Sequence, residues 1–224
     1  LRRTLMVHGH WSYRRMSHVA IIMIYKNIVF ISAQLWFSFF NLWSPTSYYS
    51  GFVMSCFNLV FTALPPFIFG FWEQDLDQDI LEGSPELYPV EYDPMSTLNL
   101  FYYIILGLFQ SLVAYFIPFI VTPDFSLVES GILTYMIAVY IVVCQVMMWQ
   151  SFQNGWTFGL YTVNIVLAPI IIVIYCKFIS GNLADVVNHA MDTTVFWMSF
   201  IVGVVLGILP SFIYEYTMKR YRPS

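Results

Sequence analysis

Long apolar runs, separated by short polar or turn-forming segments, dominate the sequence from end to end. The hydrocarbon core of a bilayer is about 30 Å thick and is crossed by roughly 20 helical residues, so each run of this length predicts a membrane-spanning helix. The segment WSPTSYYSG separates the first two runs and has the composition of a turn. The pattern therefore predicts an all-α, polytopic membrane protein, a six-transmembrane-helix bundle that begins with a helical hairpin. The predicted spans are Ser17 to Leu42, Gly51 to Trp72, Leu100 to Val121, Gly131 to Trp149, Trp156 to Lys177 and Thr194 to Tyr214.

The composition supports this fold class. Of the 224 residues, 59% are hydrophobic and 10% are charged, and nine Lys and Arg with thirteen Asp and Glu are too few to cover a soluble domain of this size. The three cysteines, Cys56, Cys144 and Cys176, lie inside apolar runs at unrelated spacings, which indicates neither a disulfide framework nor a zinc site. We therefore expect the helices to be surrounded by membrane lipid and not by water.

The distribution of basic residues predicts the orientation of the bundle. Six crossings place both chain ends on the same side of the membrane, and basic residues favour the cytosolic side. Basic residues flank the first and last spans, and only Lys177 opposes them at the far side. We therefore expect both termini to be cytosolic, together with the segment from Glu73 to Asn99, which carries eight acidic residues and no Lys or Arg. The flanking basic residues are Arg2, Arg3, Arg14, Arg15, Lys219, Arg220 and Arg222.

Polar residues recur on one face of the first predicted span. Lys26 falls near the bilayer midplane, where a lysine costs about 2.5 to 3.5 kcal/mol. Asn27, Gln34 and Asn41 are spaced seven residues apart, and Ser38 lies four residues beyond Gln34. At helical periodicity these residues form one polar stripe, which we expect to face protein or water and not lipid.

The second predicted span carries a matching polar face. Ser55, Asn58 and Thr62 are spaced three and four residues apart, so they share one side of a helix. The sequence Leu64-Pro65-Pro66 follows at once and predicts a kink. Because a short turn joins the two helices, we expect their polar faces to meet.

Two interpretations of these polar residues remain open. A charge is a poor choice for packing alone, so we interpret Lys26 as a residue that binds a substrate or an ion. Asn27 and Asn58 fit either a binding or a packing role. A voltage sensor is disfavoured, because it needs several regularly spaced Arg or Lys residues. Hydrogen bonding between helices is the simpler interpretation for the remaining polar residues, Gln34, Ser38, Asn41, Ser55 and Thr62.

The acidic segment after the second span has the spacing of a calcium-binding loop but not its chemistry. Asp75, Asp77, Asp79 and Glu86 match the ligand positions, yet the position that requires glycine is Ile80. We therefore predict no metal site and interpret the segment as a solvated acidic loop.

The sequence shows none of the common catalytic motifs of soluble enzymes. The four histidines form no HExxH pair, and the sequence contains neither a glycine-rich phosphate loop nor a nucleophile elbow, so we expect no catalytic residue in this chain. Asp124, Glu129, Asp185 and Asp192 fall in far-side loops, where we expect them to be solvated.

Several motifs, in order along the whole chain, resemble the C-terminal membrane half of the type IV P-type ATPases, the phospholipid flippases. They are LMVHGHWSYRRMS (5–17), which resembles the approach to the family's fifth span, YKN (25–27) at the centre of that span, FNLVFTALPPFIFGFWEQD (57–75) for the sixth span, PELY (85–88) for the cytosolic loop that follows, and LPSFIYEYTMKRYRP (209–223) for the exit of the tenth span.

The resemblance implies a function in lipid transport. Such enzymes hydrolyse ATP through a phospho-aspartate and move a phospholipid from the outer to the cytosolic leaflet. The family's lipid path carries over by motif to Lys26, Asn27 and Asn58 as substrate-binding residues. ATP and Mg²⁺ would be bound by upstream domains of the same chain, since the phosphorylated Asp-Lys-Thr-Gly-Thr motif is absent here. The implied partners are the phospholipid substrate, membrane lipids and an accessory glycoprotein beta subunit, with no nucleic acid, and the implied location is the plasma membrane or the endomembranes of Golgi and endosome.

We therefore expect five parts along the chain and keep two rival functions open. Residues 1–16 would approach from an upstream phosphorylation domain, 17–72 form the helical hairpin, 73–99 the acidic cytosolic loop, 100–214 four further transmembrane helices and 215–224 the cytosolic C-terminal end. One alternative is a self-contained six-span channel or secondary transporter, in which Lys26 binds an anion or a small solute. The other is a purely structural membrane fragment.

Overall fold

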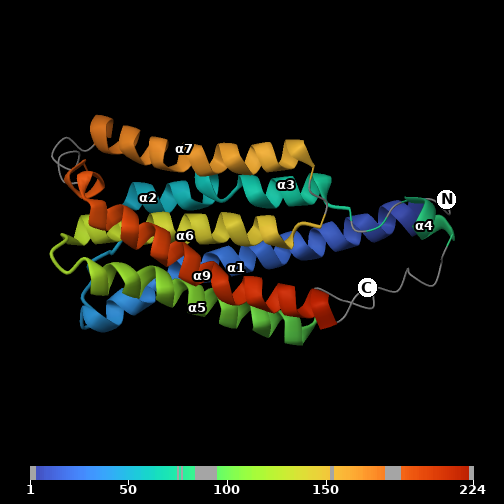
Figure 1. Ribbon diagram of the computed structural model, residues 1–224, viewed down its shortest axis with the longest axis horizontal. Coiled ribbons are helices and arrows are strands. Elements are labelled where there is room, and N and C mark those ends of the chain that lie inside the picture. The colour runs from blue at the N-terminus through green and yellow to red at the C-terminus, as the bar shows by residue number, and fades with distance from the viewer. Residues whose placement is uncertain are drawn as a thin grey trace.

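The computed structural model describes residues 4–74, 76, 78–83, 95–151, 154–179 and 188–221, and these residues contain helices and no strand. The helices run along one long axis and form a bundle (Figure 1). Its elements are η1 (Thr4–Gly9), α1 (His10–Phe40), α2 (Gly51–Cys56), η2 (Phe57–Phe61), α3 (Leu64–Trp72), α4 (Gln78–Gly83), α5 (Thr97–Val121), α6 (Leu127–Trp149), α7 (Gly155–Ile179) and α9 (Thr194–Tyr221).

The predicted all-α bundle with six spans is confirmed. Six helical stretches are long and apolar enough to cross a membrane: Val7–Phe40, Val53–Trp72, Thr97–Val121, Leu127–Trp149, Gly155–Ile174 and Thr194–Thr217. The start of α1 and the end of α9 lie toward the same end of the bundle (Figure 1), called here the terminal end. The opposite end, which carries residues 41–50, is the distal end.

The first helix extends beyond its predicted span. α1 has 31 residues and is therefore about 46 Å long, more than the hydrocarbon core requires. It begins at His10, seven residues before the predicted Ser17, because nothing in that stretch breaks a helix. The extension binds the segment after α3 at the terminal end: Arg15 Nε donates to the Glu73 carbonyl oxygen (2.6 Å), and Trp11 Nε1 donates to that of Leu76 (3.2 Å).

The second span is broken into three pieces, and the predicted kink lies where the prolines place it. α2 passes into η2, a π-helical turn over Phe57–Phe61, and α3 starts afresh at Leu64. Pro65 and Pro66 fall in the first turn of α3, where a missing N–H is tolerated. The same two rings leave the backbone carbonyls four residues earlier, at Phe61 and Thr62, without a helical donor.

The fourth span is the centre of the bundle. In the most apolar stretch of α6, 78% of the residues are buried. The corresponding share is 28% in both α7 and α9, which form the periphery of the bundle. Two glycines let α9 approach α6 closely. A Cβ on Gly203 would lie 2.8 Å from Cδ1 of Ile137, and Gly207 contacts Ile141 more closely still. This spacing of two glycines four residues apart is a common way to bring membrane helices together.

Side chains hold the turn of the first hairpin against the bundle at the distal end. Gln34 Oε1 accepts a hydrogen bond from the backbone N–H of Tyr48 (2.9 Å), so this side chain binds the turn after α1, where the sequence predicted a bond between helices. The Tyr48 phenol meets Thr134 Oγ1 of α6 at 2.9 Å. Burial raises the pKa of this phenol above its usual value, and the bond to Thr134 only partly offsets that effect. The turn itself places Leu42 and Trp43 in the left-handed region, at φ 50° and 59°.

Candidate functional site

Lys26 lies near the middle of α1, and its side chain is only 1% exposed. Along one side of α1 the packing partner is the second span: the ring of His18 stacks on Phe69, and that of Phe30 stacks on Phe57. Lys26 belongs to this side and points at the break between η2 and α3. Among the described residues, the two polar faces that the sequence indicates meet at one pair, Lys26 and Thr62. Ser55 and Asn58 of the second face are exposed, so the expected contact between whole faces is wrong.

The partner of the ammonium is Thr62. Lys26 Nζ donates to Thr62 Oγ1 at 3.2 Å and to the Thr62 carbonyl oxygen at 3.3 Å. The threonine hydroxyl donates in turn to the carbonyl oxygen of Phe57 (2.6 Å), which also receives the Thr62 N–H (3.0 Å). Thr62 thus closes the π-helical turn and offers two oxygens to the lysine.

The positive charge of Lys26 is balanced by dipoles and not by an acid. Across the described ranges, no carboxylate forms an ion pair with this lysine, whose contacts are the hydroxyl and carbonyl of Thr62. A lysine has three N–H donors, and two of them are directed at Thr62. In a region of low dielectric, such a charge attracts an anion far more strongly than it would in water.

The structure does not gather all three predicted substrate-binding residues at one point. Asn27 is half-buried on α1, while Asn58, the second residue of η2, is exposed. In the part of the chain that the structure describes, no hydrogen bond joins either amide to the other or to Lys26. Lys26 is therefore a buried anchor at the break, and Asn58 lies on the outer surface of the second span.

A second polar centre on the other side of α1 was not predicted from the sequence. The phenol of Tyr25 donates to Oε1 of Gln110 in α5. Gln110 Nε2 donates to Gln145 Oε1 in α6 (3.0 Å) and to the Gly207 carbonyl oxygen in α9 (3.1 Å). Gln110 and Gln145 are both fully buried, so this network joins four helices inside the membrane. Its sequence signal is a single glutamine in each of two otherwise apolar spans.

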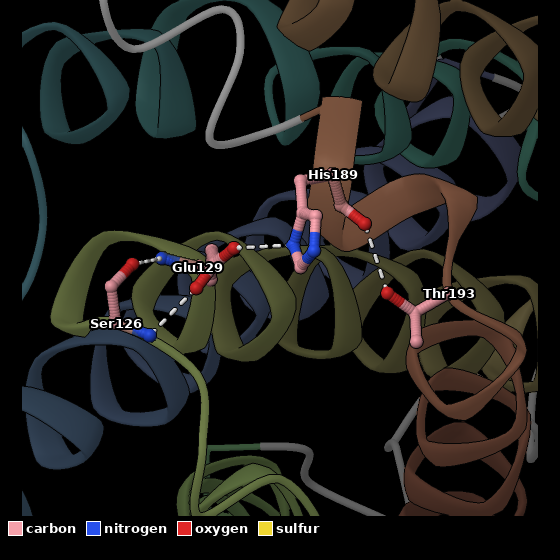
Figure 2. A network of polar contacts seen from close by, with 4 residues as sticks. All are labelled: Ser126, Glu129, His189 and Thr193. Atoms are coloured by element: carbon pink, nitrogen blue, oxygen red, sulfur yellow. Dashed lines mark hydrogen bonds and ion pairs between the residues drawn. The ribbon is translucent and has the colours of Figure 1, made fainter.

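A polar contact at the distal end corrects one expectation. Glu129, expected in a solvated loop, lies in the first turn of α6 and is 7% exposed. Its carboxylate accepts the Ser126 backbone N–H (2.6 Å), while Ser126 Oγ accepts the Glu129 N–H (3.4 Å), which completes a capping box. Figure 2 shows the other carboxylate oxygen directed at His189, whose Nδ1 is 3.5 Å away. The acid is buried because it caps the helix.

A metal site finds no support among the described residues, where no group of three or more His, Cys, Asp and Glu side chains could hold an ion. Three of the four acidic residues with calcium-loop spacing, Asp75, Asp77 and Glu86, lie outside the described residues.

Comparisons with known proteins give the following. The family model described as "Phospholipid-translocating P-type ATPase C-terminal" matches residues 1–224. The chain is 29% identical over 235 residues to "Phospholipid-transporting ATPase VD" of Mus musculus, with 100% of this chain and 16% of that protein covered. It is 28% identical over 244 residues to "Phospholipid-transporting ATPase DNF1" and 29% identical over 244 residues to "Phospholipid-transporting ATPase DRS2", both of Saccharomyces cerevisiae, with 100% of this chain and 15% and 18% of those proteins covered. The chain thus spans less than a fifth of each of these relatives.

Proposed function

Because this chain belongs to the C-terminal family of phospholipid-translocating P-type ATPases, we propose that it forms the membrane portion of a phospholipid flippase. In this proposal, ATP hydrolysis by upstream domains drives a phospholipid from the outer to the cytosolic leaflet. Relatives that cover the whole of this chain are phospholipid-transporting ATPases by name, which supports the reaction class. The phospholipid and the surrounding membrane lipids are then its first partners.

The observation that carries the proposal is the buried ammonium of Lys26 at a broken helix. A helix interrupted at membrane depth, with irregular backbone lining the interruption, is typical of substrate sites in transporters. Lys26 would attract the phosphate of the headgroup, and the amides of Asn27 and Asn58 would donate hydrogen bonds to its polar groups. Since Asn58 is exposed and Lys26 is not, the headgroup would reach the lysine along the outer surface of η2.

The N-terminal extension of α1 would couple this site to the ATPase domains. ATP and Mg²⁺ would be bound by upstream domains, outside this chain, and residues 1–16 would approach the membrane from the phosphorylation domain among them. The bonds from Arg15 to Glu73 and from Trp11 to Leu76 tie this extension to the end of the second span. A movement of α1 at the terminal end would therefore be transmitted to the helix that faces Lys26.

The proposal also includes the orientation of the chain, the membrane that contains it and an accessory subunit. Both termini and the segment 73–99 would be cytosolic, in the plasma membrane or in Golgi and endosomal membranes. An accessory glycoprotein subunit would contact the side of the membrane opposite the termini, through WSPTSYYSG (43–51), TPDFSLVESG (122–131) and SGNLADVVNHAMD (180–192). The rival function, a self-contained six-span channel or secondary transporter, is disfavoured by the family to which the chain belongs.

The test is the substitution Lys26→Met in the full-length protein, which removes the charge and keeps the length of the side chain. We expect lipid-stimulated ATP hydrolysis and transport of a fluorescent phospholipid to fall at least about tenfold, which corresponds to roughly 1.4 kcal/mol of lost interaction. Ser55→Ala is the matched control, since the Ser55 hydroxyl bonds, among the described residues, only to the Gly51 carbonyl of its own helix (3.0 Å). Normal turnover and transport of Lys26→Met at normal expression would rule out the headgroup site.

A further inference from the structure

We propose that Thr62 is a positioning residue for lipid transport: it holds the Lys26 ammonium while no lipid is bound, and the phosphate of an arriving phospholipid must displace it. The inference rests on the proposed function and adds to it a residue for which the sequence favours a role in helix packing. It starts from the 3.2 and 3.3 Å contacts of Lys26 Nζ with the two oxygens of Thr62.

The Thr62 carbonyl is available because Pro66 follows four residues later. In a continuous helix the N–H of residue 66 would donate to this carbonyl, and proline has none. A buried carbonyl without a donor is costly, so an outside donor stabilises it. The bundle uses the same device once more, where Pro169 leaves the Ile165 carbonyl of α7 to accept from the Tyr140 phenol at 2.7 Å.

The Thr62 hydroxyl is oriented to accept and not to donate toward the lysine. Its proton goes to the Phe57 carbonyl oxygen at 2.6 Å, so a lone pair of Oγ1 faces Nζ. The result is a chain of donors from ammonium to hydroxyl to carbonyl, in which each bond polarises the next. Since no ion pair holds Lys26 in the described part of the chain, these two acceptors are its only polar contacts there.

A phosphate oxygen and Thr62 therefore compete for the same ammonium. The third N–H of Lys26 has no acceptor among the described residues, which gives an anionic oxygen a first point of attachment. The ammonium can donate its other hydrogen bonds to the phosphate only after its bonds to Thr62 break. Return of the ammonium to Thr62 would in turn favour release of the lipid after transport.

The test is Thr62→Val in the full-length protein, assayed by ATP hydrolysis in detergent micelles that contain increasing phosphatidylserine, phosphatidylcholine or phosphatidylethanolamine. Valine keeps the shape and the backbone carbonyl and removes only the hydroxyl. We expect the half-saturating concentration of the stimulating lipid to fall about three- to tenfold, the net range of one ordinary hydrogen bond, because the Thr62 carbonyl remains as an acceptor for the lysine. The maximal rate should fall as well, because release of the lipid loses the assistance of Thr62.

Two further variants separate this role from a structural one. Thr62→Ser keeps the hydroxyl and should retain the wild-type half-saturating concentration within about twofold. Thr62→Cys differs from Thr62→Ser by one atom and supplies a much weaker acceptor, so it should lower that concentration even if Thr62→Val does not fold. Ser55→Ala removes a hydroxyl that bonds the Gly51 carbonyl of its own helix in the same span, and it should behave as wild type.

The results distinguish failure of this inference from failure of the proposed function. An unchanged or raised half-saturating concentration in the folded Thr62→Val or Thr62→Cys variants would overturn the role of Thr62. If Lys26→Met still abolishes lipid stimulation in that case, the headgroup site at Lys26 stands and only the competition is wrong. The competition predicts a lower half-saturating concentration in Thr62→Val and Thr62→Cys and an unchanged one in Thr62→Ser.

Discussion

Tyr25 and Lys26 are neighbours in α1 and bind different helices: the phenol donates to Gln110 of α5, and the ammonium donates to Thr62 at the break in the second span. One side of α1 is thus fastened to the scaffold of α5, α6 and α9. The other side faces the interrupted helix, where a change of partner is easiest. Two adjacent residues separate the fixed side of α1 from the side proposed to act on the lipid.

The scaffold side can be tested at Gln110. The substitution Gln110→Leu leaves the Tyr25 phenol and the amide of Gln145 without their partner inside the membrane. We expect a loss of about 1 to 2 kcal/mol in stability, seen as a lower apparent melting temperature of the purified full-length protein in detergent. The control is Thr162→Val, because in the described part of the chain the exposed Thr162 hydroxyl bonds only to the Phe158 carbonyl of its own helix. Equal melting temperatures for both variants would show that the network carries no stability.

A close approach at the distal end gives a second prediction. A Cβ on Gly131 would lie 2.6 Å from the Tyr48 carbonyl oxygen, a backbone atom whose residue is held by its bond to Thr134. Gly131→Ala should therefore destabilise the hairpin turn against α6 by about 1 to 3 kcal/mol. Gly159→Ala is the matched control, since nothing lies within 4 Å of its Cβ position, and it should be neutral or stabilising by up to about 1 kcal/mol. Thermal unfolding of both variants decides, and a stable Gly131→Ala protein would contradict the packing described here.

The cap of α6 gives a third prediction, on Glu129. Glu129→Ala removes the acceptor for the Ser126 N–H and should lower stability by about 1 kcal/mol, whereas Glu129→Gln can still complete a capping box. His189→Ala should change little, because the His189 side chain is 81% exposed and such pairs are screened by solvent. Apparent melting temperatures of the three variants test this order. If His189→Ala were the most damaging, the contact with His189 and not the cap would hold this end together.

The size of the native protein gives a fourth prediction. The chain covers 15 to 18% of the relatives compared above. A flippase therefore requires a native protein several-fold heavier than the 26.1 kDa of this chain. An immunoblot of native membranes with an antibody against TMKRYRPS (217–224) measures this. A band at 26 kDa would favour the self-contained transporter instead.

The fold was largely predictable from the sequence because lipid imposes a simple rule. Each run of about 20 apolar residues becomes a helix, since backbone groups in hydrocarbon must bond within their own segment. The kink before Pro65 was predictable for a similar local reason. Of the two predicted polar faces, Lys26 and Thr62 are the pair that meets in the described part of the chain, because Ser55 and Asn58 are exposed. The start of α1 was not, because a helix that leaves the membrane continues until its sequence breaks it.

The partners of individual polar residues were less predictable, because they depend on packing between distant spans. The sequence favours a packing role for Thr62. Its contact with Lys26, 36 residues away in the chain, depends on how the first two spans are aligned against each other. Gln110 and Gln145 carry no motif and meet only in the folded bundle. For Glu129, the Ser126-x-x-Glu129 pattern of a capping box was present in the sequence and could have placed it on the helix.

In a structure of the full-length protein with a phospholipid captured during transport, the distance from Lys26 Nζ to the lipid phosphate shows whether the lysine binds the headgroup. We expect a phosphate oxygen at about 3 Å from Nζ, and we expect the contact of Lys26 with Thr62 Oγ1, which is 3.2 Å without lipid, to be broken. A lipid phosphate bound elsewhere, with Lys26 still on Thr62, would contradict this expectation.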